Sequence, residues 1–406
     1  MFRTPGPVLI TVLMCLAQVA TLVDVFVFAT LIRTFETEWL LTKVEQGWVL
    51  GVYHAGYVLA VPVIMALTDR IDARRLYMAG CLFIALAAAG FAFLAEGFWS
   101  ALALRALSGF GFAATYMPGL RVLVDRYPGG NESRAIAFYT SSWSLGTAVS
   151  YLLAGVLGET LGWQAAFLAG GLGALAAFAL VLVCLAPRAP TRASEPTRLL
   201  DFRPVLRNRP AMGYVLGYAA HTYELLAFRA WLVAFLAFSL TQQAEPMVGW
   251  LAEPSRIAMF TALAAMVSSI AGNELAARLD RPRFIAVVQC VTASLACVIG
   301  FLGALSYEAV VALVILYALL VQADSAALTA GVVGAAEDGR RGATLAVYNL
   351  VGWTCGFAGP VLVGVVLGAV GTESTTGWGM AFMAMGGVTF LGATAVRILA
   401  GGRRTG

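Results

Sequence analysis

Charge is scarce in this sequence of 406 residues, because only 12% of them are charged and 60% are hydrophobic. An ordinary soluble domain has about 25% charged residues, so a water-soluble globule is excluded. Lysine occurs once, as Lys43, and histidine twice, as His54 and His221. The six cysteines all lie in apolar runs, which excludes a disulfide framework, and no metal or other cofactor site is expected. No basic stripe for nucleic acid is present.

Long apolar runs are present in place of charge. A helix of about 20 apolar residues crosses a hydrocarbon core of about 30 Å. We predict an all-α integral membrane protein with twelve transmembrane helices. The twelve runs cover residues 8–33, 46–67, 76–95, 98–122, 135–157, 163–186, 211–239, 256–276, 284–304, 309–333, 343–369 and 378–399.

The basic residues predict the orientation of these helices, because cytoplasmic loops are enriched in Lys and Arg. With the N-terminus inside, 21 of the 26 basic residues fall on the inner side and three on the outer side. The other two, Arg105 and Arg229, lie within predicted helices. Both termini are therefore expected in the cytoplasm, in a plasma membrane that is a bacterial inner membrane.

Two related halves are predicted. The longest inner connection is rich in Pro and Arg and separates six helices from six, which indicates an interdomain linker. We predict an N-terminal bundle over residues 1–186, a cytoplasmic linker over 187–209 and a C-terminal bundle over 210–406. The segment GWQAAF at residues 162–167 recurs as GWGMAF at 377–382, in each case before the last helix of its half.

The connection between the second and third helices carries the most specific motif, LTDRIDARR, from Leu67 to Arg75. It resembles the inner-loop signature of the major facilitator superfamily. A weaker copy, GNELAARLDRPR, runs from Gly272 to Arg283, where a half-repeat places it. Two positions depart from the family pattern, because Met65 stands at the usual glycine and Asp72 at the second glycine.

The resemblance implies two pseudo-symmetric six-helix bundles that rock about a site at the membrane midplane. It also implies a cytoplasmic gate in which charged groups at helix ends hold the closed state. The corresponding residues are Asp69, Arg70, Arg74, Arg278 and Asp280. The alternative is that these arginines only keep their loops inside.

Ionisable residues at membrane depth are costly, so they predict a functional interior. Asp24 resembles the first-helix acid of proton-coupled exporters in this superfamily, and Arg105 resembles the fourth-helix arginine. The two lie at comparable depth and can pair, which suggests a proton carrier and its modulator, or an anion ligand. The fifth helix lacks the Gly-Pro pair of the exporters.

The seventh helix has the densest cluster of such residues. At 100° per residue, His221, Glu224 and Arg229 share one broad face. Glu224 can exchange protons or pair with Arg229, and His221 can relay protons. Asp324 can complement Arg229 or bind a cation. A static salt bridge between helices is the competing interpretation for this cluster.

Polar and aromatic residues near these charges are candidate cavity walls, although packing explains the aromatics equally well. They are Tyr139, Trp143, Gln322, Tyr348 and Asn349.

These features predict a secondary active transporter that moves a small organic, anionic solute together with protons. Proton-coupled efflux of drugs or metabolites is the alternative, and Na⁺ coupling or uniport stays open. A membrane enzyme would need a nucleophile with a base, which the sequence does not supply. A sensor would carry an appended signalling domain, and none is expected here. No ATP-binding signature occurs. The expected partners are the solute, H⁺ and the lipid bilayer, and the protein is expected to be a monomer.

Overall fold

The computed structural model describes residues 6–127, 133–188, 202–245, 247–337 and 340–401. Every regular element within these residues is a helix. The chain divides into two compact units. Unit 1 comprises residues 1–41 and 52–195, and unit 2 comprises residues 42–51 and 196–406.

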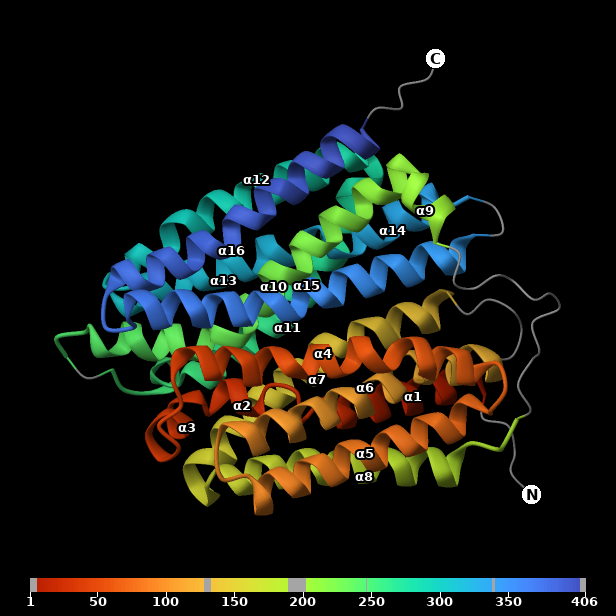
Figure 1. The fold of residues 1–406 in the computed structure, drawn as a ribbon, viewed down its shortest axis with the longest axis horizontal. Coiled ribbons are helices and arrows are strands. Elements are labelled where there is room, and N and C mark those ends of the chain that lie inside the picture. The colour runs from red at the N-terminus through yellow and green to blue at the C-terminus, as the bar shows by residue number, and fades with distance from the viewer. Residues whose placement is uncertain (1–5, 128–132, 189–201, 246, 338–339, 402–406) are drawn as a thin grey trace. The chain divides into compact units, whose positions relative to one another are not determined.

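Unit 1 contains eight helical segments, of which one begins in unit 2. That one is α4, whose first turns belong to unit 2. Within unit 1, α5 packs against α6 and α8, and α1 packs against α6, α7 and α8 (Figure 1). The segments are α1 (Pro7–Thr21), α2 (Val27–Thr30), α3 (Ile32–Glu38), α4 (Lys43–Thr68), α5 (Ala73–Leu94), α6 (Phe98–Arg126), α7 (Ser133–Leu161) and α8 (Trp163–Cys184).

Unit 2 is organised around one long helix, α10, which packs against α14, α15 and α16. The α-helices of unit 2 are α9 (Arg203–Arg207), α10 (Arg209–Thr241), α11 (Pro254–Arg278), α12 (Arg281–Ile299), α13 (Tyr307–Ala323), α14 (Ser325–Ala335), α15 (Arg341–Val370) and α16 (Thr375–Ala395). Short turns of other helix types, η1 (Trp250–Ala252) and η2 (Gly300–Leu302), follow α10 and α12, and the π-helical turn η3 (Val396–Ala400) extends α16.

Several helices begin at polar capping residues. The side chain of Asp72 accepts a backbone N–H at the start of α5, Asn208 does so at α10, and Asp280 at α12. Such caps satisfy N–H groups that the first helical turn leaves unpaired. Gly162 has a φ of +86° just before α8, a conformation that favours glycine.

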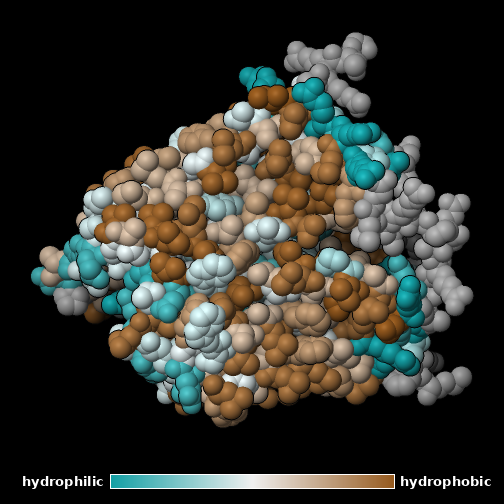
Figure 2. Space-filling view, in the orientation of Figure 1, coloured by the Kyte–Doolittle hydropathy of each residue, from teal (hydrophilic) through white to brown (hydrophobic). Residues whose placement is uncertain are grey.

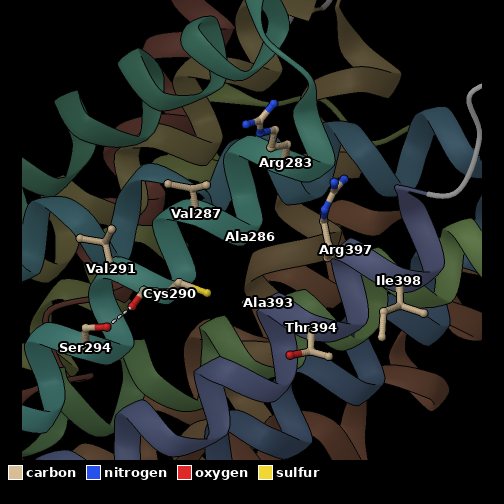
Figure 3. A pocket seen from close by; sticks show the side chains of 10 residues that line it. All are labelled: Arg283, Ala286, Val287, Cys290, Val291, Ser294, Ala393, Thr394, Arg397 and Ile398. Atoms are coloured by element: carbon tan, nitrogen blue, oxygen red, sulfur yellow. Dashed lines mark hydrogen bonds between the residues drawn. The ribbon is translucent and has the colours of Figure 1, made fainter.

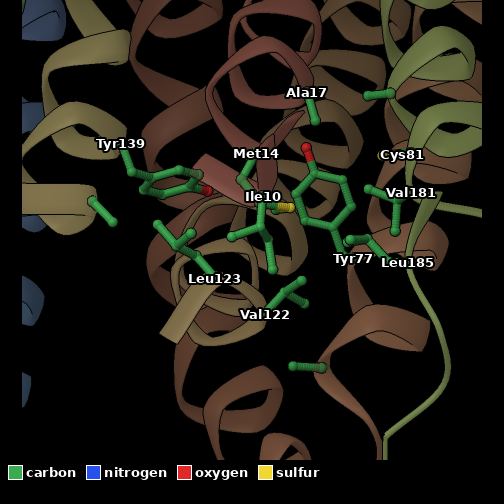
Figure 4. Close-up of a cluster of buried hydrophobic side chains, with 13 residues drawn as sticks. Ile10, Met14, Ala17, Tyr77, Cys81, Val122, Leu123, Tyr139, Val181 and Leu185 are labelled. Carbon is green, nitrogen blue, oxygen red and sulfur yellow. The ribbon is translucent and has the colours of Figure 1, made fainter. Parts of the chain in front are cut away.

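Each unit has an apolar interior of its own. In unit 1, Met14, Tyr77, Leu123, Tyr139 and Val181 bring five helices into one cluster (Figure 4). Large apolar side chains also face outward, as the lipid-facing surface of a membrane protein requires. Figure 2 shows hydrophobic residues over much of the visible outer surface of both units, with hydrophilic residues gathered near helix ends.

The predicted all-α membrane protein is confirmed. Ten helices of the described residues are long and apolar enough to cross a membrane. Each of the twelve predicted runs coincides with a helix or with consecutive helical segments.

Two predicted helices are not continuous. The run 8–33 is split into α1, α2 and the start of α3, and the run 309–333 is split into α13 and α14. The predicted linker 187–209 contains the short helix α9 and the first residue of α10. Residues 189–201, the middle of that linker, lie outside the described residues.

Candidate functional site

The first predicted helix is interrupted around Asp24. Residues 22–26 form turns between α1 and α2, which frees backbone groups that a continuous helix pairs internally. The hydroxyl of Ser150, in α7, satisfies two of these groups. It accepts the N–H of Phe26 at 3.0 Å and donates to the carbonyl of Val23 at 2.7 Å. Specific hydrogen bonds within unit 1 therefore stabilise the interruption.

Arg105 of α6 binds both the carboxylate of Asp24 and the interrupted backbone. Its Nη1 lies 3.0 Å from Oδ2 of Asp24, and its Nη2 donates to the carbonyl of Val25 at 2.7 Å. Ser108, one turn further along α6, donates its hydroxyl to the same carboxylate oxygen. The guanidinium also lies 4.7 Å from the ring centre of Tyr53. Asp24 and Arg105 are 1% and 3% exposed, so the pair is removed from solvent.

Two glycines allow neighbouring helices to pack closely against this interruption. A Cβ at Gly170 of α8 would lie 2.9 Å from Cβ of Asp24. A Cβ at Gly146 of α7 would lie 2.6 Å from Cδ1 of Leu22. Both distances are shorter than a van der Waals contact, so only glycine lets α7 and α8 approach this segment so closely.

A second interruption lies in unit 2, at Asp324 between α13 and α14. Oδ1 of Asp324 lies 2.8 Å from Nδ1 of His221 on α10, which makes an ion pair when the imidazole is protonated. Nε2 of Gln289, on α12, donates to Oδ2 of Asp324 at 2.8 Å and to the carbonyl of Gly217 at 3.0 Å. One carboxylate thus ties three helices together.

Glu224 lies one turn after His221 on α10 and binds different groups. It accepts hydrogen bonds from the hydroxyls of Tyr317 at 2.8 Å and Thr292 at 3.5 Å. Further along α10, Nη2 of Arg229 donates to Oε1 of Gln322 at 3.3 Å. The three charged positions predicted on one face of this helix are therefore all buried, and each meets its own partners.

Each unit places a buried acid at a helix interruption, beside a basic residue. The helices that carry the acid and the base are exchanged between the two units. In unit 1 the acid, Asp24, is on the first predicted helix and its cation, Arg105, is on the fourth. In unit 2 the acid, Asp324, is on the fourth predicted helix of that half and its basic partner, His221, is on the first. Interrupted helices at membrane depth are characteristic of substrate and ion sites in transporters.

The candidate wall residues make contacts within their own units. The Tyr139 hydroxyl donates to a carbonyl of α6 at 2.9 Å, and the ring of Trp143 lies 5.2 Å from that of Phe112. Tyr348 stacks on Tyr218 with ring centres 3.8 Å apart, and Asn349 donates to a carbonyl of its own helix, α15. Gln322 contacts one of the predicted charged residues, Arg229.

At the ends of α4 and α6, the predicted gate residue Asp69 lies 3.6 Å from Arg121. Arg121 also pairs with Asp125 on its own helix at 3.2 Å. Arg70 is exposed. Arg74 has a different environment, because it is 8% exposed and donates to the carbonyls of residues 181 and 182 near the end of α8.

Asp72 is the central acid of this region. Nη2 of Arg126 donates to its carboxylate at 2.9 Å, and the backbone N–H groups of Arg74 and Arg188 donate at 3.0 and 2.8 Å. Burial alone raises the pKa of the Asp72 carboxyl. The hydrogen bonds from Arg188, Arg126 and Arg74, with the charge of Arg126, outweigh burial, and this pKa lies below its ordinary value.

The corresponding region of unit 2 is simpler. Arg278 pairs with Glu274 on the same exposed helix surface at 2.8 Å. Asp280 caps α12 by accepting the N–H of Arg283 at 2.9 Å. These contacts are local, so within unit 2 the weaker motif copy acts mainly at helix ends.

The sequence analysis did not predict several residues that contribute to these contacts. They are Ser108, Ser150, Gln289, Thr292, Tyr317 and Arg126. Ser108 follows Arg105 by three residues and Thr292 follows Gln289 by three, so each pair shares a helix face, and this spacing is a usable signal. Ser150 and Tyr317 carry no local signal, because only the fold brings them to their partners.

Comparison with known proteins agrees with this architecture. The family model described as "Major Facilitator Superfamily" matches residues 14–253, which is more than half of the chain. The chain belongs to the major facilitator superfamily. The superfamily assignment makes the chain a multi-pass membrane transporter and confirms the predicted fold class.

Two solved structures are similar to this major facilitator chain, and both are of a bacterial homologue of the human lysosomal transporter Spinster. The inward-facing, occupied structure has a TM-score of 0.77 at 17% identity, with 96% of each chain covered. The inward-facing, unoccupied structure has a TM-score of 0.79 at 17% identity, with 99% of each chain covered. At this identity the similarity concerns the fold.

Proposed function

We propose that this major facilitator chain couples the movement of a small organic anion to protons by alternating access. The observation that carries the proposal is the placement of a buried acid, Asp24 or Asp324, at a helix interruption in each unit, next to a basic partner. An acid beside a fixed cation releases its proton more readily than one whose cation has moved away. A conformational change that separates the pair therefore also changes proton affinity.

Arg105 and Arg229 support an anionic solute. Arg105 binds Asp24 and two backbone carbonyls, and Arg229 donates a hydrogen bond to Gln322. We assign anion binding to Arg105 and Arg229, and proton carriage to Asp24 and Glu224. We also place the chain in a bacterial inner membrane as a monomer with both termini in the cytoplasm.

Proton-coupled efflux is the second candidate function. The acid on the first helix favours it, since Asp24 stands at the position that resembles the acid of proton-coupled exporters. The fifth predicted helix, α7, lacks their Gly-Pro pair, which favours symport instead.

Proteoliposomes loaded with the pH dye pyranine distinguish the two functions. Lactate, succinate, citrate and gluconate are added outside in turn, together with a panel of cationic drugs. Proton symport acidifies the lumen when an anion enters, whereas antiport makes the lumen more alkaline when a solute enters. The D24N variant is expected to abolish either signal. A solute that enters without any proton signal would refute proton coupling and indicate uniport.

A further inference from the structure

A groove of about 600 Å³ lies between α12 and α16 on the outside of unit 2 (Figure 3). Its walls are largely aliphatic and include Val287, Val291, Ala393 and Ile398. Arg283, in the first turn of α12, and Arg397, in the π-helical turn η3, also line it. A π-helical turn is rare and is often found at a functional site.

The groove is separate from the buried charges described above. On α12, Gln289 and Thr292 are 1% exposed and face their partners inside unit 2. Val287 and Val291, on the other face of the same helix, are 55% and 45% exposed. In a membrane protein this second face contacts lipid, so the groove opens to the bilayer.

The two hydroxyl groups in the apolar part of the groove already form hydrogen bonds within the protein. The hydroxyl of Ser294 donates to the carbonyl of Cys290 at 2.8 Å, and that of Thr394 donates to the carbonyl of Phe390 at 2.8 Å. Both hydroxyls are thereby satisfied by their own helices. An acyl chain can therefore lie along this wall without leaving a polar group unpaired.

The two arginines provide the only charges of the lining. Their guanidinium groups form no ion pair within the part of the chain that the structure describes, although Asp280 accepts the backbone N–H of Arg283. Arg278, at the same end of the unit, is by contrast paired with Glu274. Arg283 and Arg397 are thus available to an anion that approaches from the membrane.

The length of the groove matches one leaflet of a bilayer. Its lining on α12 runs from Arg283 to Ser294, and eleven residues at a rise of about 1.5 Å span about 16 Å. That is about half of the ~30 Å hydrocarbon core. Because α12 begins where η3 ends, both arginines lie at the same end of the groove, at the level of lipid headgroups.

We propose that this groove binds an anionic phospholipid from the surrounding bilayer. The phosphate lies between Arg283 and Arg397, and one acyl chain follows Val287, Val291 and Ile398. A zwitterionic lipid carries no net charge to balance the arginines, and free phosphate has no apolar part for the rest of the groove. Basic pockets between transmembrane helices are known to select anionic headgroups. The proposal does not depend on which solute is transported.

Native mass spectrometry of the purified full-length protein tests the proposal, with palmitoyl-oleoyl phosphatidylglycerol and its phosphatidylcholine counterpart as probes. We expect tight adducts with phosphatidylglycerol only. The variants R283Q and R397Q should each weaken binding about five-fold, and the double variant about 30-fold. R278Q is the matched control, since it removes one charge at the same end outside the groove, and binding should change less than about two-fold.

A second measurement uses the native side chain of Cys290, which is exposed in the groove. Phosphatidylglycerol should slow the reaction of Cys290 with a maleimide, as read by peptide mapping, whereas phosphatidylcholine and millimolar inorganic phosphate should not. Equal protection by phosphatidylcholine, or equal weakening by R278Q, would overturn the proposal. Protection by inorganic phosphate alone would show that only an anion binds.

Discussion

The carboxylate of Asp324 lies 2.8 Å from Nδ1 of His221, at the point where α13 ends and α14 begins. The same carboxylate is held from a third helix by Gln289. A partner that gains or loses a proton at this position can therefore act on three helices at once. The Asp24 and Arg105 pair has a similar position in unit 1, where it joins α6 to the interruption between α1 and α2.

The Glu224 carboxylate provides a first prediction. The substitution E224Q should abolish transport driven by a pH gradient and preserve solute counterflow, because the amide oxygen can still accept from Tyr317 but the amide does not take up or release a proton in this pH range. Both activities are measured in proteoliposomes with the solute found in the dye assay. Y317F is the control, since it removes the donor and keeps the acid. Equal loss of both activities in E224Q would identify Glu224 as a structural residue.

The pair of Asp24 and Arg105 provides a second prediction, on stability. R105A leaves a buried carboxylate without its cation and should cost roughly 3–5 kcal/mol. Adding D24N removes that stranded charge, so the double variant should be more stable than R105A alone. Thermal unfolding in detergent measures the order of stability of the variants. A double variant that unfolds below both single variants would show that the two residues act independently.

The pair of His221 and Asp324 predicts a coupling energy. The variants H221Q, D324N and the double variant form a cycle, and a contact of this kind is expected to give roughly 0.5–3 kcal/mol. Q289L tests the role of the third helix, because it removes the donor to Asp324 without changing charge. Additive effects of H221Q and D324N on both unfolding and transport would remove this pair from the proposed site.

Asp72 predicts a dependence of stability on pH. Because its pKa is lower in the folded protein than in the unfolded chain, its charge stabilises the fold above its ordinary pKa. This stabilisation is lost as the pH falls through the lowered value. D72N should therefore cost about 1–3 kcal/mol at pH 7, and the difference from the natural protein should vanish in acid.

The comparison of D72N with D72A separates charge from capping at the start of α5. Asparagine caps a helix as well as aspartate, whereas alanine does not. D72A should thus remain less stable than the natural protein even where the carboxyl is protonated. A D72N variant that unfolds with the natural pH dependence would assign that dependence to another group.

The predicted orientation is tested at the two ends of α15. Its 30 residues span more than a hydrocarbon core, so Arg340 and Glu373, which flank it, should lie on opposite sides of the membrane. Cysteine at position 373 should react with an impermeant maleimide in intact cells, and cysteine at position 340 only after permeabilisation. The reverse pattern would invert the topology.

Apolar length was enough to predict the helices, because crossing a bilayer imposes a minimum run of apolar residues. It was not enough to predict the interruption at Asp24. Residues 22–26 read LVDVF and contain neither Gly nor Pro, so no local propensity favours a break there. Distant groups, Ser150 and Arg105, provide the hydrogen bonds that make the break stable.

The structure forms only some of the contacts that the sequence predicted between charged residues. The depth of Asp24 and Arg105 in their helices indicated a pair, and the structure contains it. For Asp324 the sequence offered Arg229 as a partner, whereas the structure places His221 beside it and Gln322 beside Arg229. His221 and Arg229 are eight residues apart, about two turns of α10. Which of them meets Asp324 depends on how α10 packs, and a single sequence does not encode that packing locally.

The exchange of acid and base between the two units has an electrical consequence. An arginine side chain is a permanent cation in proteins, whereas a histidine side chain exists in a neutral and a charged form. Asp24 in unit 1 therefore faces a permanent cation, whereas Asp324 in unit 2 faces an imidazole that makes an ion pair only in its protonated form. Any movement of Arg105 along the membrane normal is therefore driven or opposed by the membrane voltage.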